Sequence, residues 1–220
     1  MKVFTKEEIK KSLLLYAITD SRWLKTDEKL INVCKDVLDS GATFLQIREK
    51  DLDPNSFAKE AEELRELCNN YNIPFVVNDS IEIAKKCSAD GVHLGQSDIK
   101  GKNLRQEIGK DMILGISAGT VEEAKQAEEI GADYIGVGSM FHTGTKDSTR
   151  ILTFEDLKDI VNSVSIPVVA IGGLNIENIS QLKNTGIDGI AVVSAIFAAD
   201  DKKSATKKLL ELSKEVVYGE

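Results

Sequence analysis

The chain has 220 residues, of which 42% are hydrophobic and 29% are charged, and its formal net charge is −8 at pH 7. This composition is typical of a soluble globular protein, and the length suffices for a sizeable core. It excludes three classes: we find no basic block for nucleic acid, no apolar run near the ~20 residues of a membrane span, and a start too polar for a secretory signal.

The surplus of acidic residues also constrains the ligands that the chain can bind. Anionic molecules are repelled at long range by the net charge of −8. An anionic ligand must therefore be held by local positive groups or by a metal ion.

Eight short apolar runs recur along the chain, and each leads into polar or glycine-containing residues and then a helical pattern. They are residues 13–18, 42–47, 74–77, 91–94, 112–116, 134–137, 167–171 and 189–193. Continuous apolar strands alternating with helices predict a parallel sheet covered by helices. An open doubly wound sheet has the same alternation, but eight units exceed the usual number of about five or six.

We therefore predict an α/β fold, a (β/α)8 or TIM barrel, that forms a single domain over residues 1–220. A short amphipathic helix at residues 5–11 precedes the first strand. Asp53 and Pro54 form the expected start of the helix that follows the second strand. Barrels of this kind carry their chemistry on the loops that follow the strands.

Three cysteines, Cys34, Cys68 and Cys87, lie far apart in the sequence without a CxxC motif. All three fall within predicted helices. We therefore expect buried, reduced thiols in a cytoplasmic protein rather than a metal or redox site.

The motif QIREK ends the second predicted strand. Because side chains alternate along a strand, Leu45 and Ile47 are expected to face the covering helices, and Gln46, Arg48 and Lys50 the barrel interior and its mouth. Converging cations need an anion, since an unpaired buried charge is costly. The segment leaves two interpretations open: a bound anionic ligand, or an arginine–carboxylate pair that only fills the barrel.

Two aspartates follow neighbouring predicted strands. Asp79 comes after Asn78 at the end of the third strand, and Asp98 follows the fourth. Two carboxylates at one site repel each other unless they share a proton or a cation, and Mg²⁺ suits such a pair. Each aspartate could instead cap the next helix, and a shared proton for acid–base chemistry is a third interpretation.

The seventh and eighth units end in the loops IGGLN, residues 171–175, and VVSA, residues 192–195. Glycines let backbone N–H groups approach a ligand, and a helix N-terminus favours an anion. Phosphate binding at these two loops recurs in α/β barrels. We therefore favour a phosphate site over glycine turns without a ligand.

Residues 140–150 form a longer loop rich in threonine, glycine and charge, typical of a mobile lid or of an ordinary solvated loop. The two histidines are His93 and His142. A hydrogen-bonded core residue is favoured over a catalyst for His93, and His142 is expected to be peripheral. Arg22 and Trp23 either border the site or pack their loop.

With these residues placed, the chain resembles the thiamine phosphate synthase family. The matching segments are YAITD (16–20), QIREK (46–50), VNDS (77–80), DGVHLGQSD (90–98), LGISAGT (114–120), GADYIGVG (131–138), TGTK (143–146), VVAIGGL (168–174) and VVSAIF (192–197). They follow one another over nearly the whole chain. QIREK with VNDS and GQSD is far more specific than IGG and VVS, which many phosphate-binding barrels carry.

The resemblance implies a transferase of thiamine biosynthesis that joins hydroxymethylpyrimidine diphosphate to hydroxyethylthiazole phosphate, with release of diphosphate and with Mg²⁺ as cofactor. A dissociative substitution of this kind needs no protein nucleophile. It needs the leaving anion to be stabilised and the two rings to be aligned.

The resemblance also implies the site residues. The pyrimidine diphosphate would be held by Gln46, Ile47, Arg48, Glu49, Lys50, Asn78, Ser117 and Lys146. The thiazole phosphate would be held by Thr143, Gly144, Thr145, Gly173, Val193 and Ser194. Mg²⁺ would be held by Asp79 and Asp98. The catalytic residues among them would be Arg48, Lys50, Ser117 and Lys146.

Four positions depart from the commoner family pattern: Gly119, Ser139, Met140 and His142. These departures bear on the conformation of the loop at residues 140–150 more than on the reaction.

Two other functions compete with this one. A thiazole tautomerase-like isomerase would share the barrel and the thiazole phosphate site but would not need the diphosphate cluster. A phosphate-ligand sensor without turnover would not need the metal pair. Retention of Arg48, Lys50, Asp79 and Asp98 favours the synthase, and we allow for a homo-oligomer, with no nucleic acid or membrane partner.

Overall fold

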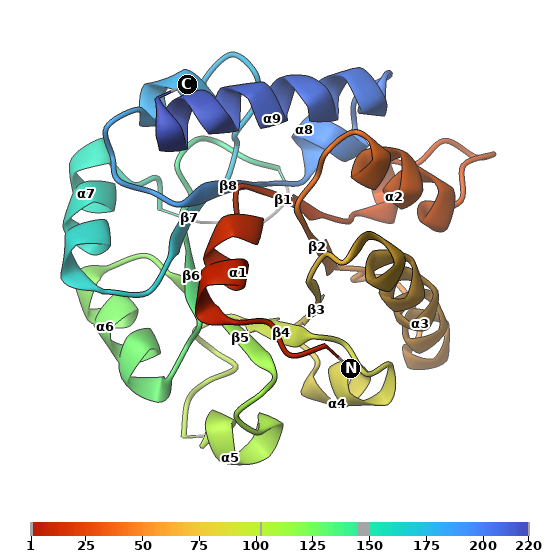
Figure 1. The fold of residues 1–220 in the computed structure, drawn as a ribbon, viewed down its shortest axis with the longest axis horizontal. Coiled ribbons are helices and arrows are strands. Elements are labelled where there is room, and N and C mark those ends of the chain that lie inside the picture. The colour runs from red at the N-terminus through yellow and green to blue at the C-terminus, as the bar shows by residue number, and fades with distance from the viewer. Residues whose placement is uncertain (1, 102, 145–149, 220) are drawn as a thin grey trace.

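The computed structural model describes residues 2–101, 103–144 and 150–219. These residues contain eight strands: β1 Leu15–Ile18, β2 Phe44–Ile47, β3 Phe75–Asn78, β4 Gly91–Leu94, β5 Ile113–Ala118, β6 Tyr134–Val137, β7 Val168–Ile171 and β8 Gly189–Val192. Each strand pairs in parallel with the next, and β8 pairs with β1, so the sheet is a closed barrel. The predicted (β/α)8 barrel is confirmed (Figure 1).

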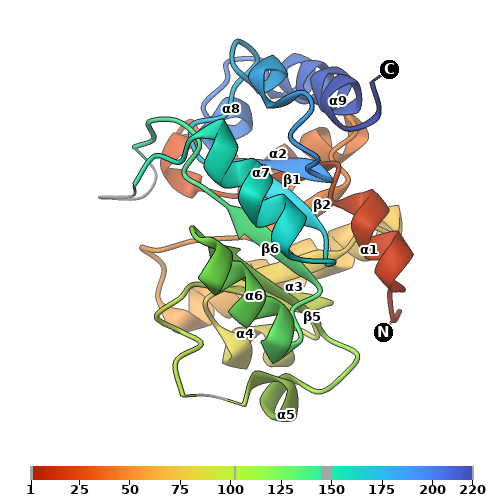
Figure 2. The ribbon, with the colours of Figure 1, turned by 90° about the vertical axis from the view of Figure 1, so that its left-hand side faces the viewer.

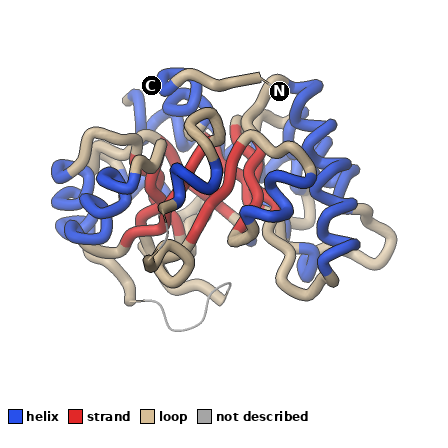
Figure 3. Tube along the Cα trace, turned by 90° about the horizontal axis from the view of Figure 1, so that it is seen from below, coloured by secondary structure: helices blue, strands red, loops and turns tan. Residues whose placement is uncertain are grey.

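Helices surround the strands on the outside, as Figure 3 shows with helices in blue around strands in red. In chain order they are α1 Lys6–Ser12, α2 Leu30–Asp39, α3 Pro54–Tyr71, α4 Ile81–Lys86, α5 Leu104–Ile108, α6 Val121–Ile130, α7 Phe154–Ser163, α8 Ser194–Phe197 and α9 Lys202–Tyr218. Two 3-10 turns complete the set, η1 Ser21–Trp23 and η2 Ile179–Leu182.

The seventh unit differs from the predicted strand-then-helix pattern. Between β7 and β8 the chain forms only η2, which has four residues. The connection spans residues 172–188 and begins with two glycines, both with positive φ. The barrel closes without an α-helix at this position.

A larger hydrophobic core lies between the strands and the ring of helices. It contains Leu45 and Ile47, whose side chains are fully buried against the helical layer. Cys34, Cys68 and Cys87 are buried in the same layer and form no disulfide among the described residues. The alternation of QIREK across the sheet is thereby confirmed for its two apolar members.

A second, smaller core fills the barrel itself. It combines Tyr16, Phe44 and Tyr134 from the strands with Ile9 from α1 and Leu13 from the segment before β1. The α1 helix lies across the end of the barrel (red, in front of the strands in Figure 1; right-hand side in Figure 2). Its apolar residues close that end of the barrel interior.

Local sequence explains where α1 and α3 begin. Thr5 and Glu8 form a reciprocal capping box at the start of α1. The Asp53 side chain accepts hydrogen bonds from two backbone N–H groups at the start of α3, with Pro54 as the first helical residue. Both starts agree with the prediction.

Within residues 2–101, 103–144 and 150–219, no helix combines the length and the apolar character that a membrane crossing would require.

Candidate active site

A pocket opens at the carboxyl ends of the strands, at the opposite end of the interior from α1. It is lined by residues of every strand or of the loop that follows it: Tyr16, Ile18, Gln46, Arg48, Asn78, His93, Ser117, Gly136, Gly138, Ser139, Thr143, Val169, Ile171, Gly172, Gly173, Leu174, Ala191, Val192, Val193 and Ser194. Sites of α/β barrels lie at this end, because the loops after the strands converge there.

The pocket brings together eight of the residues that the resemblance implied. From the pyrimidine diphosphate set these are Gln46, Arg48, Asn78 and Ser117, and from the thiazole phosphate set Thr143, Gly173, Val193 and Ser194. The two sets thus line one pocket, although their members are spread from residue 46 to residue 194.

The other implied residues are not among the described residues that line the pocket. The Ile47 side chain faces the helical layer, and Lys50, Asp79 and Gly144 are exposed at the surface. Glu49 is engaged with the loop after β1. Thr145 and Lys146 lie outside the described residues, and their roles stay predictions.

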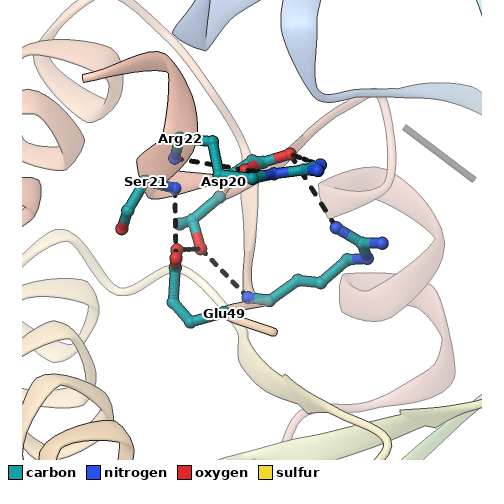
Figure 4. A network of polar contacts seen from close by, with 6 residues as sticks. Asp20, Ser21, Arg22 and Glu49 are labelled. Atoms are coloured by element: carbon teal, nitrogen blue, oxygen red, sulfur yellow. Dashed lines mark hydrogen bonds and ion pairs between the residues drawn. The ribbon is translucent and has the colours of Figure 1, made fainter. Parts of the chain in front are cut away.

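Among the described residues, Arg48 is the cation that lines the pocket, and its side chain is 11% exposed. Its guanidinium lies 3.9 Å from a carboxylate oxygen of Asp20. The Asp20 carboxylate also accepts two hydrogen bonds from the Arg22 guanidinium, at 2.8 and 2.7 Å. Arg48 is therefore held from one side by a buried carboxylate that it shares with a second arginine. Figure 4 shows the pairing of Asp20 with that second arginine, Arg22.

The backbone next to Arg48 is fixed by the same network. The Arg48 N–H donates to the Thr19 hydroxyl at 3.0 Å, and that hydroxyl donates to Glu49 at 2.6 Å. The second Glu49 oxygen accepts from the backbone N–H of Ser21 at 3.0 Å. The loops after β1 and β2 are thus joined at the pocket rim, as Figure 4 shows.

Asp20 stays ionised in this setting. Burial raises the pKa of its carboxyl, but hydrogen bonds and ion pairing with Arg22, and the charge of Arg48, outweigh burial and bring the pKa below its ordinary value. Asp20 belongs to YAITD, which was quoted for the resemblance but not predicted as a site residue. The sequence signal that could have identified Asp20 as a site residue is its position beside Thr19, at the end of an apolar strand.

Asp79 and Asp98 lie at the carboxyl ends of neighbouring strands. The Asp79 N–H donates to the backbone oxygen of His93 on β4 at 2.9 Å, and Asp98 accepts from the N–H of Gly95 just after β4 at 2.9 Å. Asp79 has φ +61°, in the left-handed region that non-glycine residues seldom adopt outside special sites.

The alternative in which these aspartates cap helices is wrong. The α4 helix is capped by the Ser80 side chain, and α5 by the Asn103 side chain. Asp98 instead accepts its hydrogen bond within a turn. Neither aspartate is therefore the N-cap residue of the helix that follows it.

The two carboxylates fit a Mg²⁺ site whose remaining coordination positions are filled by a bound ligand and water. Within the described part of the chain, no three His, Cys, Asp or Glu side chains gather around a common metal position. Mg²⁺ commonly takes one or two carboxylates and fills its remaining positions with water and substrate phosphates. Two aspartates at adjacent strand ends match that usage.

The loops after β6 and β7 are packed closely together. Backbone hydrogen bonds join Met140 to Ile171 and Phe141 to Gly172, both at 3.0 Å. Gly173 has φ +66°, and a Cβ there would lie 2.4 Å from the His142 oxygen. Only glycine fits this contact. The first residues of the loop at 140–150 are therefore fixed to the glycine pair, and His142 supplies backbone rather than side chain to this contact.

Sequence reasoning missed the two tyrosines below the pocket, whereas His93 is hydrogen-bonded there as expected. Tyr16 and Tyr134 lie in the barrel interior with their hydroxyls 2.8 Å apart, and the Tyr134 hydroxyl lies 3.0 Å from Nδ1 of His93. His93 is half-buried at the pocket wall, with Nε2 3.0 Å from Ser117 Oγ. Strand alternation, which puts Tyr134 on the same face as Gly136, could have indicated that Tyr134 points inward.

The comparisons with known proteins show the family to which the chain belongs. The family model described as thiamine monophosphate synthase matches residues 15–196. The chain is 48% identical over 198 residues to the thiamine-phosphate synthase of Ruminiclostridium cellulolyticum, covering 90% of this chain and 94% of that protein. It is 45% identical to the thiamine-phosphate synthase of Methanobrevibacter smithii, with the same two shares.

A solved structure is similar as well. The thiamine phosphate pyrophosphorylase from Pyrococcus furiosus superposes with a TM-score of 0.86 at 39% identity, covering 95% of this chain and 99% of that one. The similarity therefore extends over nearly the whole chain.

Proposed function

This chain belongs to the thiamine monophosphate synthase family, and we propose that it joins hydroxymethylpyrimidine diphosphate to hydroxyethylthiazole phosphate, forming thiamine phosphate and diphosphate. One structural observation supports the proposal independently of the family match. Arg48, Asn78 and Ser117 line the same pocket as Gly173 and Ser194, so a diphosphate and a phosphate can be held on opposite sides of one space.

Arg48 stabilises the leaving diphosphate. Its side chain is nearly buried, where a charge interacts more strongly than in water, and Asp20 fixes its direction before substrate arrives. As the bond between the pyrimidine methylene and the diphosphate oxygen breaks, negative charge grows on the departing group. A cation already in place stabilises that change without rearranging.

Gln46, Asn78 and Ser117 orient the pyrimidine diphosphate at the floor and wall of the pocket. The wall facing them is apolar, with Val169, Ile171 and Leu174. An apolar wall keeps water from the cation that remains on the pyrimidine methylene, so that the thiazole nitrogen captures it. Holding the two rings in contact supplies much of the rate acceleration in reactions of this kind.

Gly173, Val193, Ser194 and Thr143 hold the thiazole phosphate. They lie on the loops after β6, β7 and β8, and the glycine lets the backbone approach a phosphate closely. Thr145 and Lys146 extend this proposal to residues outside the described part of the chain.

Mg²⁺ is proposed to bind Asp79 and Asp98, with the diphosphate and water as further ligands. When bound, it would neutralise charge on the diphosphate and make that group a better leaving group. The three buried thiols without a disulfide support a location in the cytoplasm.

The proposal is tested with purified protein, both substrates and Mg²⁺, with products identified by mass spectrometry. We expect thiamine phosphate and diphosphate in equal amounts, and no product once a chelator is added. Isomerisation of the thiazole compound in the absence of the pyrimidine would support the tautomerase instead. Saturable binding of both ligands without product would support the sensor.

A further inference from the structure

Five side chains from five strands form a continuous hydrogen-bonded row across the barrel interior. The Gln46 amide nitrogen donates to the Tyr16 hydroxyl. That hydroxyl lies 2.8 Å from the hydroxyl of Tyr134, which lies 3.0 Å from Nδ1 of His93. Nε2 of His93 lies 3.0 Å from Ser117 Oγ at the pocket wall. We call these residues the interior row.

The interior row is built into the packing of the barrel. Tyr16 and Tyr134 are 1% and 0% exposed, and both rings pack on Phe44, at centroid distances of 4.4 and 5.6 Å. His93 and Tyr134 come from β4 and β6, so β5 runs between them. They meet because β5 has Gly115 at that point: a Cβ there would lie 2.2 Å from the Tyr134 ring and 2.5 Å from Nδ1 of His93.

Both tyrosines keep their hydrogen. Burial raises the pKa of the Tyr16 hydroxyl and of the Tyr134 hydroxyl, so each remains a neutral O–H with one hydrogen to donate. A buried hydroxyl hydrogen without an acceptor is costly, so the direction of every bond in the interior row follows from where these two hydrogens go.

The direction is set from the Gln46 end. An amide N–H can only donate, so the Tyr16 oxygen accepts from Gln46. The acceptor that the structure shows for the Tyr16 hydrogen is the Tyr134 oxygen, and the Tyr134 hydrogen then goes to Nδ1 of His93. The opposite direction would leave the Tyr16 hydrogen with no acceptor among the hydrogen bonds of the described residues.

We propose that Tyr16 and Tyr134 are positioning residues that hold His93 as the tautomer with its hydrogen on Nε2, so that Ser117 accepts from His93 and donates its own hydrogen into the pocket. A neutral imidazole whose Nδ1 accepts must carry its hydrogen on Nε2. Nε2 donates to Ser117 Oγ, which leaves the serine hydrogen for a ligand.

The inference deepens the proposed function and rests on it only for the identity of the ligand. A hydroxyl of fixed direction recognises a hydrogen-bond acceptor, and an oxygen that gains negative charge as the diphosphate leaves is such an acceptor. The two tyrosines thus act on the substrate without touching it, through His93 and Ser117.

The first test uses the ligand-free wild-type protein and does not depend on activity. Long-range proton–nitrogen NMR correlations report which imidazole nitrogen of a histidine carries the hydrogen. The chain has only two histidines, and the His142→Gln variant assigns the pair. We expect His93 to be neutral with its hydrogen on Nε2. A hydrogen on Nδ1, or an even mixture of tautomers, overturns the proposal.

The second test removes one hydroxyl. Tyr134→Phe keeps the ring but deletes the donor to Nδ1, so we expect a mixture of His93 tautomers. We also expect kcat to fall by about 10-fold, which is the smallest loss usually seen when a residue that orients a functional side chain is removed. The KM for the pyrimidine diphosphate should stay within about twofold of the wild-type value. A reduced kcat with an unchanged tautomer would contradict the role of His93.

A matched control makes the same chemical change elsewhere. Tyr71→Phe deletes a tyrosine hydroxyl that donates to Asp39 between α3 and α2. We expect it to leave kcat, KM and the His93 tautomer unchanged, and an equal fall in kcat would contradict the positioning role of Tyr134. If wild-type protein released no diphosphate, the proposed function would fail, whereas the tautomer in the ligand-free protein would still decide the inference.

Discussion

The two ends of the barrel interior differ in what they contribute. The end covered by α1 is closed by apolar side chains such as Ile9 and Leu13, and little there can bind a ligand. The end at the carboxyl termini of the strands carries buried Asp20 and Arg48, left-handed Asp79 and closely packed loops. One end supplies stability and the other arranges charge, so substitutions at the two ends should separate folding from activity.

The largest expected effect is at the pocket end. Arg48→Met keeps most of the side-chain volume but removes the charge, and we expect kcat/KM to fall about 10²–10³-fold, as for loss of one electrostatic group in comparable sites. The melting temperature should change by less than about 4 °C. Diphosphate release and thermal unfolding measure the two quantities. Lys35→Met, at an exposed ion pair on α2, serves as the control and should change neither.

The reverse result is expected at the α1 end. Ile9 is 3% exposed and packs into the interior core, so Ile9→Ala should lower the free energy of unfolding by about 2–4 kcal/mol. Steady-state kinetics of the folded variant should remain within about twofold of wild type. Urea unfolding and the diphosphate assay decide this. A loss of activity at temperatures where the variant is fully folded would show that the two ends are not separate.

Substitution of Asp20 tests whether a buried carboxylate at the pocket end contributes to activity or to the stability of the fold. Asp20→Asn removes the negative charge that lies 3.9 Å from the Arg48 guanidinium, and we expect kcat/KM to fall by about 10-fold. An unchanged kcat/KM would mean that Arg48 needs no such partner.

The pH dependence of stability adds a second measurement on Asp20. The folded-state pKa of Asp20 lies below the ordinary value of 3.8, so the stability that its charge provides is fully present above about pH 4. It is lost as the pH falls through the folded-state pKa. The difference in unfolding free energy between wild type and Asp20→Asn should therefore be constant from pH 7 to about pH 4 and should shrink below that.

The smallest effect is expected at Glu60 on α3. One of its oxygens is buried without a hydrogen-bond partner among the described residues, and burial, with the charges of Glu49 and Glu63, raises its pKa. A raised carboxyl pKa lowers stability at neutral pH relative to acid. Glu60→Gln should therefore increase the free energy of unfolding at pH 7 by less than about 1 kcal/mol, and the gain should vanish below about pH 4.5. Urea unfolding at both pH values measures it.

Much of the fold could be predicted because it follows from local patterns. The apolar runs mark the strands, and alternation within QIREK separates Leu45 and Ile47 from Gln46 and Arg48. The start of α3 follows from Asp53 and Pro54. These features depend on neighbouring residues, so the sequence contains the information directly.

The parts that could not be predicted depend on contacts across the closed barrel. Tyr16, His93 and Tyr134 are far apart in the sequence and meet only because the strands curve around one interior. Their contact also requires the missing side chain of Gly115. The pairing of Asp20 with Arg48 likewise joins two strand ends whose register no local pattern specifies.

Closure of the barrel has a consequence for synthesis of the protein. The pairing of β1 with β8 aligns Leu15 with Ile190, so β1 gains this neighbouring strand only after residue 190 has left the ribosome. Until then β1 has an unpaired edge, and exposed edges of apolar strands promote aggregation. A nascent chain halted before residue 189 would lack its last strand altogether. Chaperone demand should therefore be highest late in translation and should drop once β8 emerges.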